Sequence, residues 1–263
     1  AIVERLKAKY RLSWFSETGP LHRVRFRILK DKVSLMVDTS GEGLHKRGYR
    51  RESNLAPMKE TLAAALCKLA RVRPDGNFID PFCGSGTLLI EAALLAGNIA
   101  PGLHRTFQAE SWRDADPQVW RRERERARDL ERRDITFTAT GYDIDPAAAA
   151  LTPENAKKAG VAAQVRAWVR DIRDFREEGP YGCVVCNPPY GERLLDGEEA
   201  RRLIQVMGQV FQPRRGWSYG VITPEPEFEK LYGRRADKRR KLYNGMIPCQ
   251  FYQYFKAETG AKR

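Results

Sequence analysis

Two kinds of hydrophobic pattern alternate along most of this 263-residue chain. Short apolar runs, which are typical of buried strands, occur at residues 78–80, 136–141, 164–169, 183–186 and 218–222. Between them apolar residues recur at helical spacing, which predicts helices over residues 87–96, 146–159 and 198–211. Repeated strand–helix units form a parallel sheet with helices on both faces. The pattern therefore predicts a doubly wound α/β fold.

The N-terminal part of the chain departs from this repeat and predicts a small α+β remnant followed by a linker. Residues 23–29 and 33–38 have the composition of two strands of a hairpin. Pro57 is expected to open a helix with Leu62, Leu66 and Leu69 on one face. We therefore divide the chain into a linker region over residues 1–50 and one main domain over residues 51–263.

The C-terminal part predicts a second hairpin. Residues 239–243 and 249–255 flank Asn244-Gly245, a dipeptide typical of tight hairpin turns. Together with the five strands of the repeat, this antiparallel hairpin gives a sheet of seven strands that is mostly parallel.

Composition narrows the class of protein. Hydrophobic residues make up 42% of the chain, which excludes wholesale disorder. No apolar run approaches the ~20 residues that a membrane span needs. Five cysteines, an odd number without framework spacing, suit a reducing cytosol, so we expect a cytoplasmic protein. Lys and Arg outnumber Asp and Glu by 47 to 34, and the net charge of +13 favours a polyanionic partner.

Metal binding is not expected. Cys183 and Cys186 have CxxC spacing, but they lie within one predicted strand, where residues three apart point to opposite faces. His22, His45 and His104 are scattered, without partners at the spacing of a metal site.

Two basic segments have different implications. Residues 121–133 interleave arginines with acids, which is typical of a solvated helix, although the surrounding segment 97–133 could also line an RNA channel. Residues 234–241 contain one acid, Asp237, and are either a phosphate-contacting surface or an ordinary hairpin surface.

The turn after the first strand of the repeat is the first candidate binding site. Asp80 ends the strand, and Gly84 and Gly86 permit close backbone approach or a positive φ. The next helix begins immediately afterwards and presents free N–H groups. The spacing fits neither a P-loop nor a dinucleotide fingerprint. An acid before such a turn suits a zwitterionic ligand that carries an ammonium and a carboxylate.

Further polar residues end the other strands, and in such sheets the strand ends share one crevice. Asp143 can accept both hydroxyls of a ribose, whereas Asp145 before Pro146 is expected to be a helix N-cap. Asp171 can accept from an exocyclic amine or cap a turn. The last strand end carries a rigid polar and aromatic turn, Asn187-Pro188-Pro189-Tyr190.

These motifs resemble a known group of enzymes. The segments 80–87 and 187–193 resemble class I S-adenosylmethionine-dependent methyltransferases, which have a Rossmann-like fold and act on exocyclic amines of bases. More narrowly, with Gly48-Tyr49-Arg50 and residues 56–63 and 241–245, the chain is similar to the THUMP-associated RNA guanine-N2 methyltransferases of the UPF0020 type. The resemblance covers about residues 33–256, and residues 1–50 resemble the end of a THUMP module.

The resemblance implies roles for individual residues. S-adenosylmethionine would be held at its methionine end by Asp80, Gly84 and Gly86, with Lys59, Glu60 and Thr61 closing that side. Asp143 would bind the ribose and Asp171 the adenine. The remaining cofactor contacts would come from Pro81, Cys83, Ser85, Thr87, Ile144, Ile172 and Asn187. Catalysis would use Asn187, Pro188, Pro189 and Tyr190, and RNA would contact Lys46, Arg47, Arg50, Arg193, Arg239, Arg240 and Lys241.

The sequence thus predicts an enzyme of rRNA processing that methylates a guanosine N2 amine, in 23S rRNA first of all. A tRNA guanine-N2 or a nucleic-acid adenine-N6 methyltransferase uses the same amine chemistry and remains an alternative. A non-catalytic RNA-binding module is the alternative from outside the enzymes.

Overall fold

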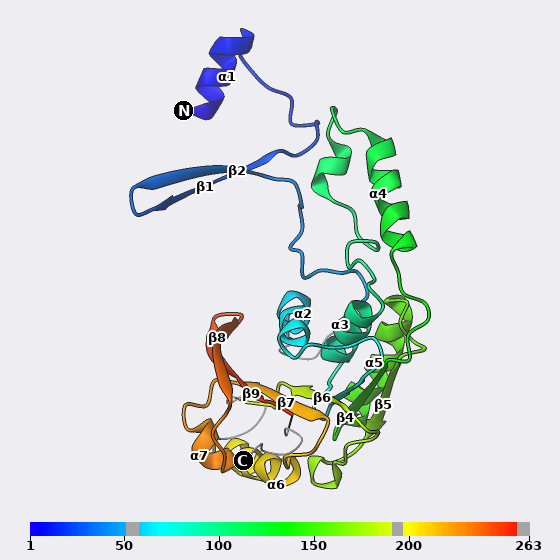
Figure 1. Cartoon of the computed structure of the whole chain (residues 1–263). Helices are drawn as coiled ribbons and strands as arrows, with labels where there is room; N and C mark the ends of the chain where they lie inside the picture. Colours follow the sequence, from blue (N-terminus) through cyan, green and yellow to red (C-terminus); the bar gives the residue numbers. More distant parts are fainter. Residues whose placement is uncertain (51–57, 191–196, 257–263) are drawn as a thin grey trace, which may run out of the picture. The chain divides into compact units, whose positions relative to one another are not determined.

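A computed structural model describes residues 1–50, 58–190 and 197–256. The chain divides into two compact units (Figure 1). One unit contains residues 1–43 and 106–122, and the rest of the described chain forms the other. The segment 106–122, which the sequence places between two strand–helix repeats, therefore belongs with the N-terminal residues.

The smaller unit contains the predicted N-terminal hairpin. Its strands are β1 (Arg23–Leu29) and β2 (Lys32–Asp38), which pair antiparallel. Their register places six exposed apolar side chains on one face, in the facing pairs Val24–Val37, Phe26–Leu35 and Ile28–Val33. The unit also contains α1 (Ile2–Tyr10), which the sequence patterns do not predict, and η1 (Gln108–Ser111). The helix α4 (Pro117–Asp129) begins in this unit.

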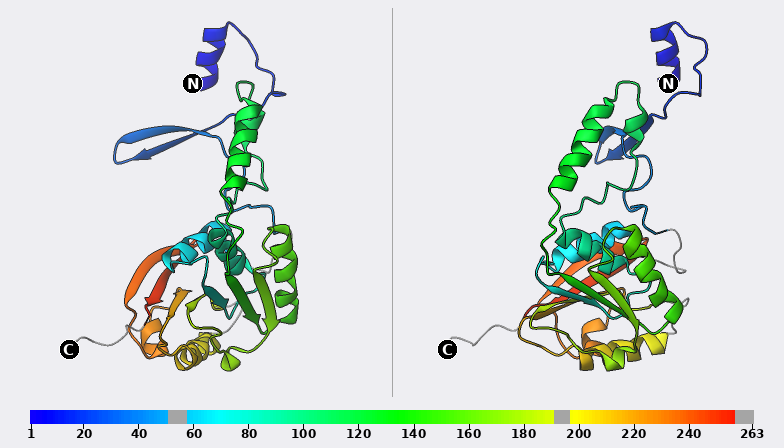
Figure 2. Two further views of the ribbon diagram at one scale, coloured as in Figure 1. Left: turned by 45° about the vertical axis from the view of Figure 1, so that its right-hand side comes forward. Right: turned by 90° about the vertical axis from the view of Figure 1, so that its right-hand side faces the viewer.

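The larger unit is built on a seven-stranded sheet in the order β5-β4-β3-β6-β7-β9-β8 (Figures 1 and 2). Neighbouring strands pair in parallel except where β9 meets β7 and β8. The predicted fold class, including the C-terminal antiparallel hairpin, is thus confirmed. The strands are β3 (Asn77–Asp80), β4 (Thr138–Asp143), β5 (Val165–Val169), β6 (Gly182–Cys186), β7 (Trp217–Thr223), β8 (Lys238–Asn244) and β9 (Ile247–Tyr254).

Helices cover both faces of this sheet (Figure 2). One face packs against α2 (Glu60–Leu69), α3 (Thr87–Ala96) and α5 (Pro146–Lys158), and the other against α6 (Gly197–Val210) and α7 (Phe228–Tyr232). Bounds lie within one or two residues of those expected for the helices of the repeat. The helix α2 starts at Glu60, with Lys59 as its N-cap, and Pro57 lies outside the described residues. The sequence patterns do not predict α7.

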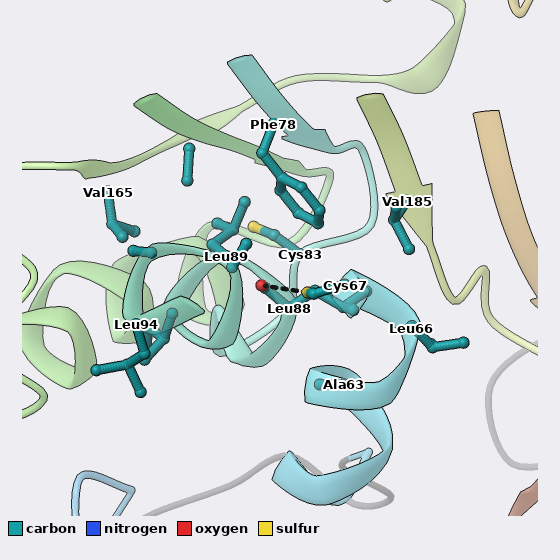
Figure 3. Packing of buried hydrophobic residues seen from close by; sticks show 14 of the residues in the cluster. Ala63, Leu66, Cys67, Phe78, Cys83, Leu88, Leu89, Leu94, Val165 and Val185 are labelled. Carbon is teal, nitrogen blue, oxygen red and sulfur yellow. Dashed lines mark hydrogen bonds between the residues drawn. The ribbon is translucent and has the colours of Figure 1, made fainter. Parts of the chain in front are cut away.

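Alternation along the strands separates two cores. Phe78 and Cys183 point to the α2–α3 side, whereas Ile79 and Cys186 point to the α6–α7 side. Figure 3 shows the first core, where Phe78 and Leu89 pack together and the Cys67 thiol donates to the Leu88 carbonyl at 3.7 Å. Cys183 and Cys186 therefore lie on opposite faces, as their strand spacing predicts.

The C-terminal hairpin differs in its turn. Asn244 still pairs with Ile247, so the two turn residues are Gly245 and Met246 rather than Asn244-Gly245. Gly245 has a φ of 64°, which a glycine adopts without strain. Among the described residues, no helix combines the length and apolar character needed to cross a bilayer.

Candidate active site

The candidate site lies where the strand order reverses. The chain runs from β3 outward through β4 to β5, then returns to place β6 on the other side of β3. Ligands of open α/β sheets bind at the carboxyl ends of the strands at such a point. Asp80 ends β3, Asp143 ends β4, and Asn187 directly follows β6. Since β3 pairs with both β4 and β6, the structure brings these three predicted residues to one edge.

The glycine turn after Asp80 has the backbone that the sequence predicts. Gly84 and Gly86 have φ values of 53° and 84°. A Cβ on Gly86 would lie 2.7 Å from Cγ2 of Thr152, so the position excludes any side chain. The turn is thereby held against α5.

Two residues of α5 that the sequence analysis does not single out support this turn. The Thr152 hydroxyl donates to the Gly84 carbonyl at 3.1 Å, and the Asn155 side-chain amide donates to the Ser85 carbonyl at 3.0 Å. Both side chains are buried. The available signal is the spacing of three between Thr152 and Asn155, which places both on the face that carries Ala148, Ala149 and Ala156.

Asp80 is a buried carboxyl with an unusual affinity for its proton. Burial raises the pKa of Asp80 to about 8; the Phe82 N–H, at 3.0 Å, lowers the pKa and the neighbouring Asp143 charge raises it. Such a group favours a cation, because a positive charge beside the carboxylate offsets the cost of desolvation. An amino-acid ammonium is a ligand of this kind.

Asp143 connects the end of β4 to the glycine turn. Its carboxylate accepts from the Gly84 N–H at 2.8 Å and from the Asp145 N–H at 3.0 Å. Asp145 accepts from the Ala147 N–H at 2.9 Å and is the N-cap of α5, which confirms the N-cap prediction. Each Asp143 oxygen has a second lone pair with which to accept from a ligand hydroxyl.

Asp171 has the geometry of the second of its two predicted roles. Its carboxylate accepts from the Arg173 N–H at 2.8 Å and caps η2 (Ile172–Asp174). The Arg173 guanidinium also donates to both carboxylate oxygens, and this pairing lowers the pKa of Asp171. Nearby, Ile172 is buried in the second core, whereas Ile144 after β4 is 69% exposed and offers an apolar surface at the strand ends.

The three residues that are predicted to contact the cofactor at the start of α2, Lys59, Glu60 and Thr61, differ in their exposure. Glu60 is buried and pairs with Arg50 at 3.0 Å, while its second oxygen, Oε2, has no hydrogen-bond partner among the described residues. Lys59 and Thr61 are exposed on the other side of the helix, where they line a hollow of about 290 Å³ with Tyr243 and Gly245 of the hairpin. Of the three, only Glu60 is buried, and its charge acts on the buried Glu91 of α3.

The Asn187–Tyr190 segment combines an unsatisfied acceptor with a fixed ring. Oδ1 of Asn187 is buried and lacks a partner within the described part of the chain. The Tyr190 hydroxyl accepts from the Asn244 side-chain amide at 2.7 Å, and burial raises the pKa of Tyr190 to about 12. Pro188 is buried and Pro189 half-buried between them. A buried acceptor without a donor is costly, so its presence here points to a ligand N–H.

The cations predicted to contact RNA divide into two sets. Arg47 and Arg50 are not surface residues: their side chains are 11% exposed and pair with Glu91 and Glu60. Both guanidinium groups are therefore largely occupied within the protein, and their contact with RNA stays a prediction. Lys46 and Lys241 are exposed; Arg239 pairs with Glu229, and Arg240 donates to Gln253. Arg193 lies outside the described residues.

The arrangement fits one cofactor chemistry. A zwitterionic ligand is suited by the glycine turn, where Gly86 leaves no room for a Cβ, and by the buried Asp80 carboxyl, which favours a cation. The unsatisfied acceptors on Glu60 and Asn187 suit N–H donors, an ammonium of this ligand and an amine beside it. The sheet order with a reversed seventh strand completes the architecture. Fold and site together define a methyltransferase whose methyl donor is S-adenosylmethionine.

Comparison with known sequences gives the family. Residues 47–253 match the family described as UPF0020, RMKL-like, methyltransferase domain, and the chain belongs to this family. YpsC of Bacillus subtilis (strain 168), named as an RNA methyltransferase, is 42% identical over 97% of this chain and 67% of its own length. The ribosomal RNA large subunit methyltransferase K/L of Marinobacter nauticus is 41% identical over 86% of this chain and 33% of its own length.

Two solved structures have the same fold. SMU.472 complexed with SAH superposes with a TM-score of 0.90 at 38% identity, over 98% of this chain and 69% of that one. A protein of Listeria monocytogenes named for N6-adenine methylation of DNA superposes with a TM-score of 0.89 at 46% identity, over 98% and 67%. The chain therefore spans about two-thirds of the length of YpsC and of both structures.

Proposed function

We propose that this domain transfers a methyl group to the exocyclic N2 amine of a guanosine in RNA, in large-subunit rRNA first of all. The observation that carries the proposal is the buried, unpartnered Oδ1 of Asn187 at the end of β6. Asn187 follows β6, which pairs with β3, and β3 ends at the glycine turn that we propose to bind the cofactor. The YpsC and K/L relatives, named for RNA and for large-subunit rRNA, support the substrate class.

The chemistry explains why an amide and prolines stand at this position. An exocyclic amine shares its lone pair with the ring and is a weak nucleophile. Oδ1 of Asn187 and the Pro188 carbonyl accept from its hydrogens out of the ring plane and favour a pyramidal nitrogen. The two prolines stiffen the segment, so alignment supplies much of the acceleration. Bound S-adenosylmethionine supplies an electrophilic methyl on its sulfonium.

The same proposal assigns the cofactor contacts. Asp80 and Glu60 receive the ammonium, the turn from Gly84 to Thr87 approaches the methionine end, and Asp143 accepts from the ribose. Asp171 would accept from adenine only with the carboxylate lone pairs that Arg173 does not use. The exposed Ile144 side chain covers the adenine ring. Pro81, Cys83, Ser85 and Ile172 shape the surrounding wall.

RNA recognition is assigned to the surface around the hairpin. A paired base cannot reach a pocket at the strand ends, so the nucleotide must be unpaired or extruded, with its base stacked on Tyr190. Lys46, Arg193, Arg239, Arg240 and Lys241 are the proposed phosphate contacts. We further infer that residues 1–50 are the end of a THUMP-like module, and that the enzyme acts on its RNA in the cytoplasm.

One experiment tests the proposal. The protein is incubated with tritiated S-adenosylmethionine and total rRNA or tRNA from cells that lack the enzyme, and the labelled nucleoside is identified. Label in N2-methylguanosine from rRNA is expected. The Asn187→Ala variant should lose about a hundredfold or more in rate while its affinity for S-adenosylhomocysteine is kept. Unchanged turnover of this variant would contradict the role of Asn187.

Adenine-N6 methylation is the second candidate, since the Listeria protein carries that name and the amine chemistry is the same. Label in N6-methyladenosine would establish it in place of guanine-N2 transfer. Label confined to tRNA would retain the reaction and change the substrate. RNA binding without any transfer would support the non-catalytic module.

A further inference from the structure

A largely buried arginine joins the start of α2 to the start of α3, which directly follows the glycine turn proposed to bind the cofactor. Nη2 of Arg50 pairs with Oε1 of Glu60 at 3.0 Å, and Nη1 donates to Oγ1 of Thr87 at 3.2 Å and to the Met58 carbonyl at 3.3 Å. Glu60 opens α2, and Thr87 opens α3 directly after Gly86. One guanidinium therefore fixes the distance between α2 and the turn.

Only an arginine can make this set of contacts. The guanidinium is planar and presents several N–H donors in a fixed fork. Its two terminal nitrogens serve different elements here, and the side chain is 11% exposed, so water does not replace these bonds freely. A lysine keeps the charge but holds it at a single nitrogen, and cannot serve Glu60 and Thr87 in the same geometry.

The Arg50 contact also determines which Glu60 oxygen remains available. Oε1 is engaged by Arg50, whereas Oε2 is buried and has no hydrogen-bond partner among the residues that the structure describes. The Glu60 side chain is 4% exposed. An unsatisfied carboxylate oxygen at this burial is costly unless a ligand donor compensates it.

We propose that Arg50 is a positioning residue for the cofactor: it holds Glu60 with Oε2 presented to the ammonium and holds the first residue of α3 against the methionine end. This inference rests on the proposed contact between Glu60 and the ammonium. It removes Arg50 from the predicted RNA surface and gives the Gly48-Tyr49-Arg50 segment a part in the cofactor site.

A second buried pair nearby provides a matched control. The Arg47 side chain is also 11% exposed and pairs with Oε1 of Glu91 at 3.5 Å. Oε1 of Glu91 accepts from the Tyr49 hydroxyl at 3.1 Å, and Glu91 lies a turn further along α3 than Thr87. Arg47 thus has the charge, exposure and type of partner of Arg50, although its Nε lacks hydrogen-bond geometry to Glu91 and its Nη1 donates to the Leu44 carbonyl at 2.7 Å. Among the described residues, its ion pair and hydrogen bond do not involve the first residue of α2 or of α3.

The test compares Arg50→Lys with Arg47→Lys by calorimetric titration with S-adenosylhomocysteine and by thermal unfolding. Arg50→Lys is expected to weaken binding about tenfold, because the fork that orients Glu60 is lost. Arg47→Lys should leave the dissociation constant within about twofold, although both variants unfold at a lower temperature. Equal affinities for the two variants would overturn the inference. So would a loss of affinity that tracks the loss of thermal stability in both.

Glu60→Gln separates failure of this inference from failure of the proposed cofactor contact. If Glu60→Gln binds S-adenosylhomocysteine as the wild type does, the ammonium contact itself is wrong. If Glu60→Gln weakens binding and Arg50→Lys does not, the contact stands and the positioning role of Arg50 is wrong. If Arg50→Lys fails to fold, the double variant Arg50→Met with Glu60→Gln removes the uncompensated charge and takes its place. In the folded double variant, further loss of affinity relative to Glu60→Gln is expected, and equal affinity overturns the inference.

Discussion

The Asn244 side-chain amide donates a 2.7 Å hydrogen bond to the Tyr190 hydroxyl across 54 residues of sequence. Asn244 is the last residue of β8, so the bond attaches the Asn187–Tyr190 segment to the tip of the C-terminal hairpin. The Tyr190 ring, which we propose to stack on the target base, is thus oriented by a strand at the far edge of the sheet.

Replacement of Asn244 should therefore affect the RNA step and spare the cofactor. Loss of one such bond costs about 1 kcal/mol, so Asn244→Ala is expected to reduce kcat/KM for RNA about fivefold. The dissociation constant of S-adenosylhomocysteine should not change. Asn98→Ala is the control, because its amide makes a bond of 2.8 Å to the Leu130 carbonyl away from the site. Equal effects of the two variants would remove the role of Asn244.

Asp143 should be required for cofactor binding. It supports the Gly84 N–H and is proposed to accept from the ribose. Asp143→Ala is expected to weaken binding of S-adenosylhomocysteine about tenfold or more, since two charge-assisted bonds are lost. Asp145→Ala, two residues later, removes only the cap of α5 and should cost about 1 kcal/mol of stability without loss of affinity. An unaltered dissociation constant for Asp143→Ala would refute the assignment.

The raised pKa of Asp80 should make both the stability of the protein and its affinity for the cofactor depend on pH. Folding raises the pKa of Asp80 from 3.8 to about 8, so the native state binds this proton more tightly than the unfolded chain does. The stability that Asp80 contributes is present in full below about pH 4 and is lost as the pH rises through about 8.

Binding of an ammonium needs the ionised form of Asp80 and should follow the opposite trend. Affinity for S-adenosylhomocysteine is expected to increase from about pH 6 to about pH 8, by up to about tenfold per pH unit, with release of a proton. Calorimetry in two buffers of different ionisation enthalpy measures that proton. Asp80→Asn should flatten the dependence. If the variant keeps the wild-type slope, another group is responsible.

Gly86 should be irreplaceable for a steric reason that another glycine does not share. A Cβ at Gly86 meets Cγ2 of Thr152 at 2.7 Å, whereas a Cβ at Gly160 meets nothing within 4 Å. Both residues have a positive φ, of 84° and 75°. Both alanine variants therefore carry the cost of that backbone, about 1 kcal/mol, but only Gly86→Ala must displace the turn. We expect Gly86→Ala alone to lose cofactor affinity; a comparable loss in Gly160→Ala would contradict this explanation.

Local patterns predicted the features that depend on neighbouring residues. Alternation along a strand placed Cys183 and Cys186 on opposite faces, and the Asp145-Pro146 pair marked the start of α5. Parallel strands share a carboxyl edge, so the pattern of strand ends is enough to predict that Asp80, Asp143 and Asn187 lie at one edge of the sheet.

Features that depend on distant partners could not be predicted in this way. Arg47 and Arg50 have the composition of a basic linker, and their burial follows from Glu91 and Glu60, which lie on two different helices. Likewise, Asn155 supports Ser85 from 70 residues away. The motif that contains Lys59, Glu60 and Thr61 predicts one shared role for the three residues. In the structure, Glu60 is buried and the other two side chains are exposed.

The five buried cysteines can report when the layers of the molecule open. All are buried, and burial raises the pKa of every thiol, in the case of Cys183 to about 12. A thiolate attacks a disulfide reagent and expels its second sulfur as a leaving thiolate, whereas a buried thiol does not, so the native protein should stay unlabelled while its layers remain closed. Cys186 lies in the α6–α7 layer and the other four in the α2–α3 layer. Mass spectrometry of the peptides that contain each cysteine gives the order in which the thiols are labelled. That order would therefore show which side of the sheet opens first.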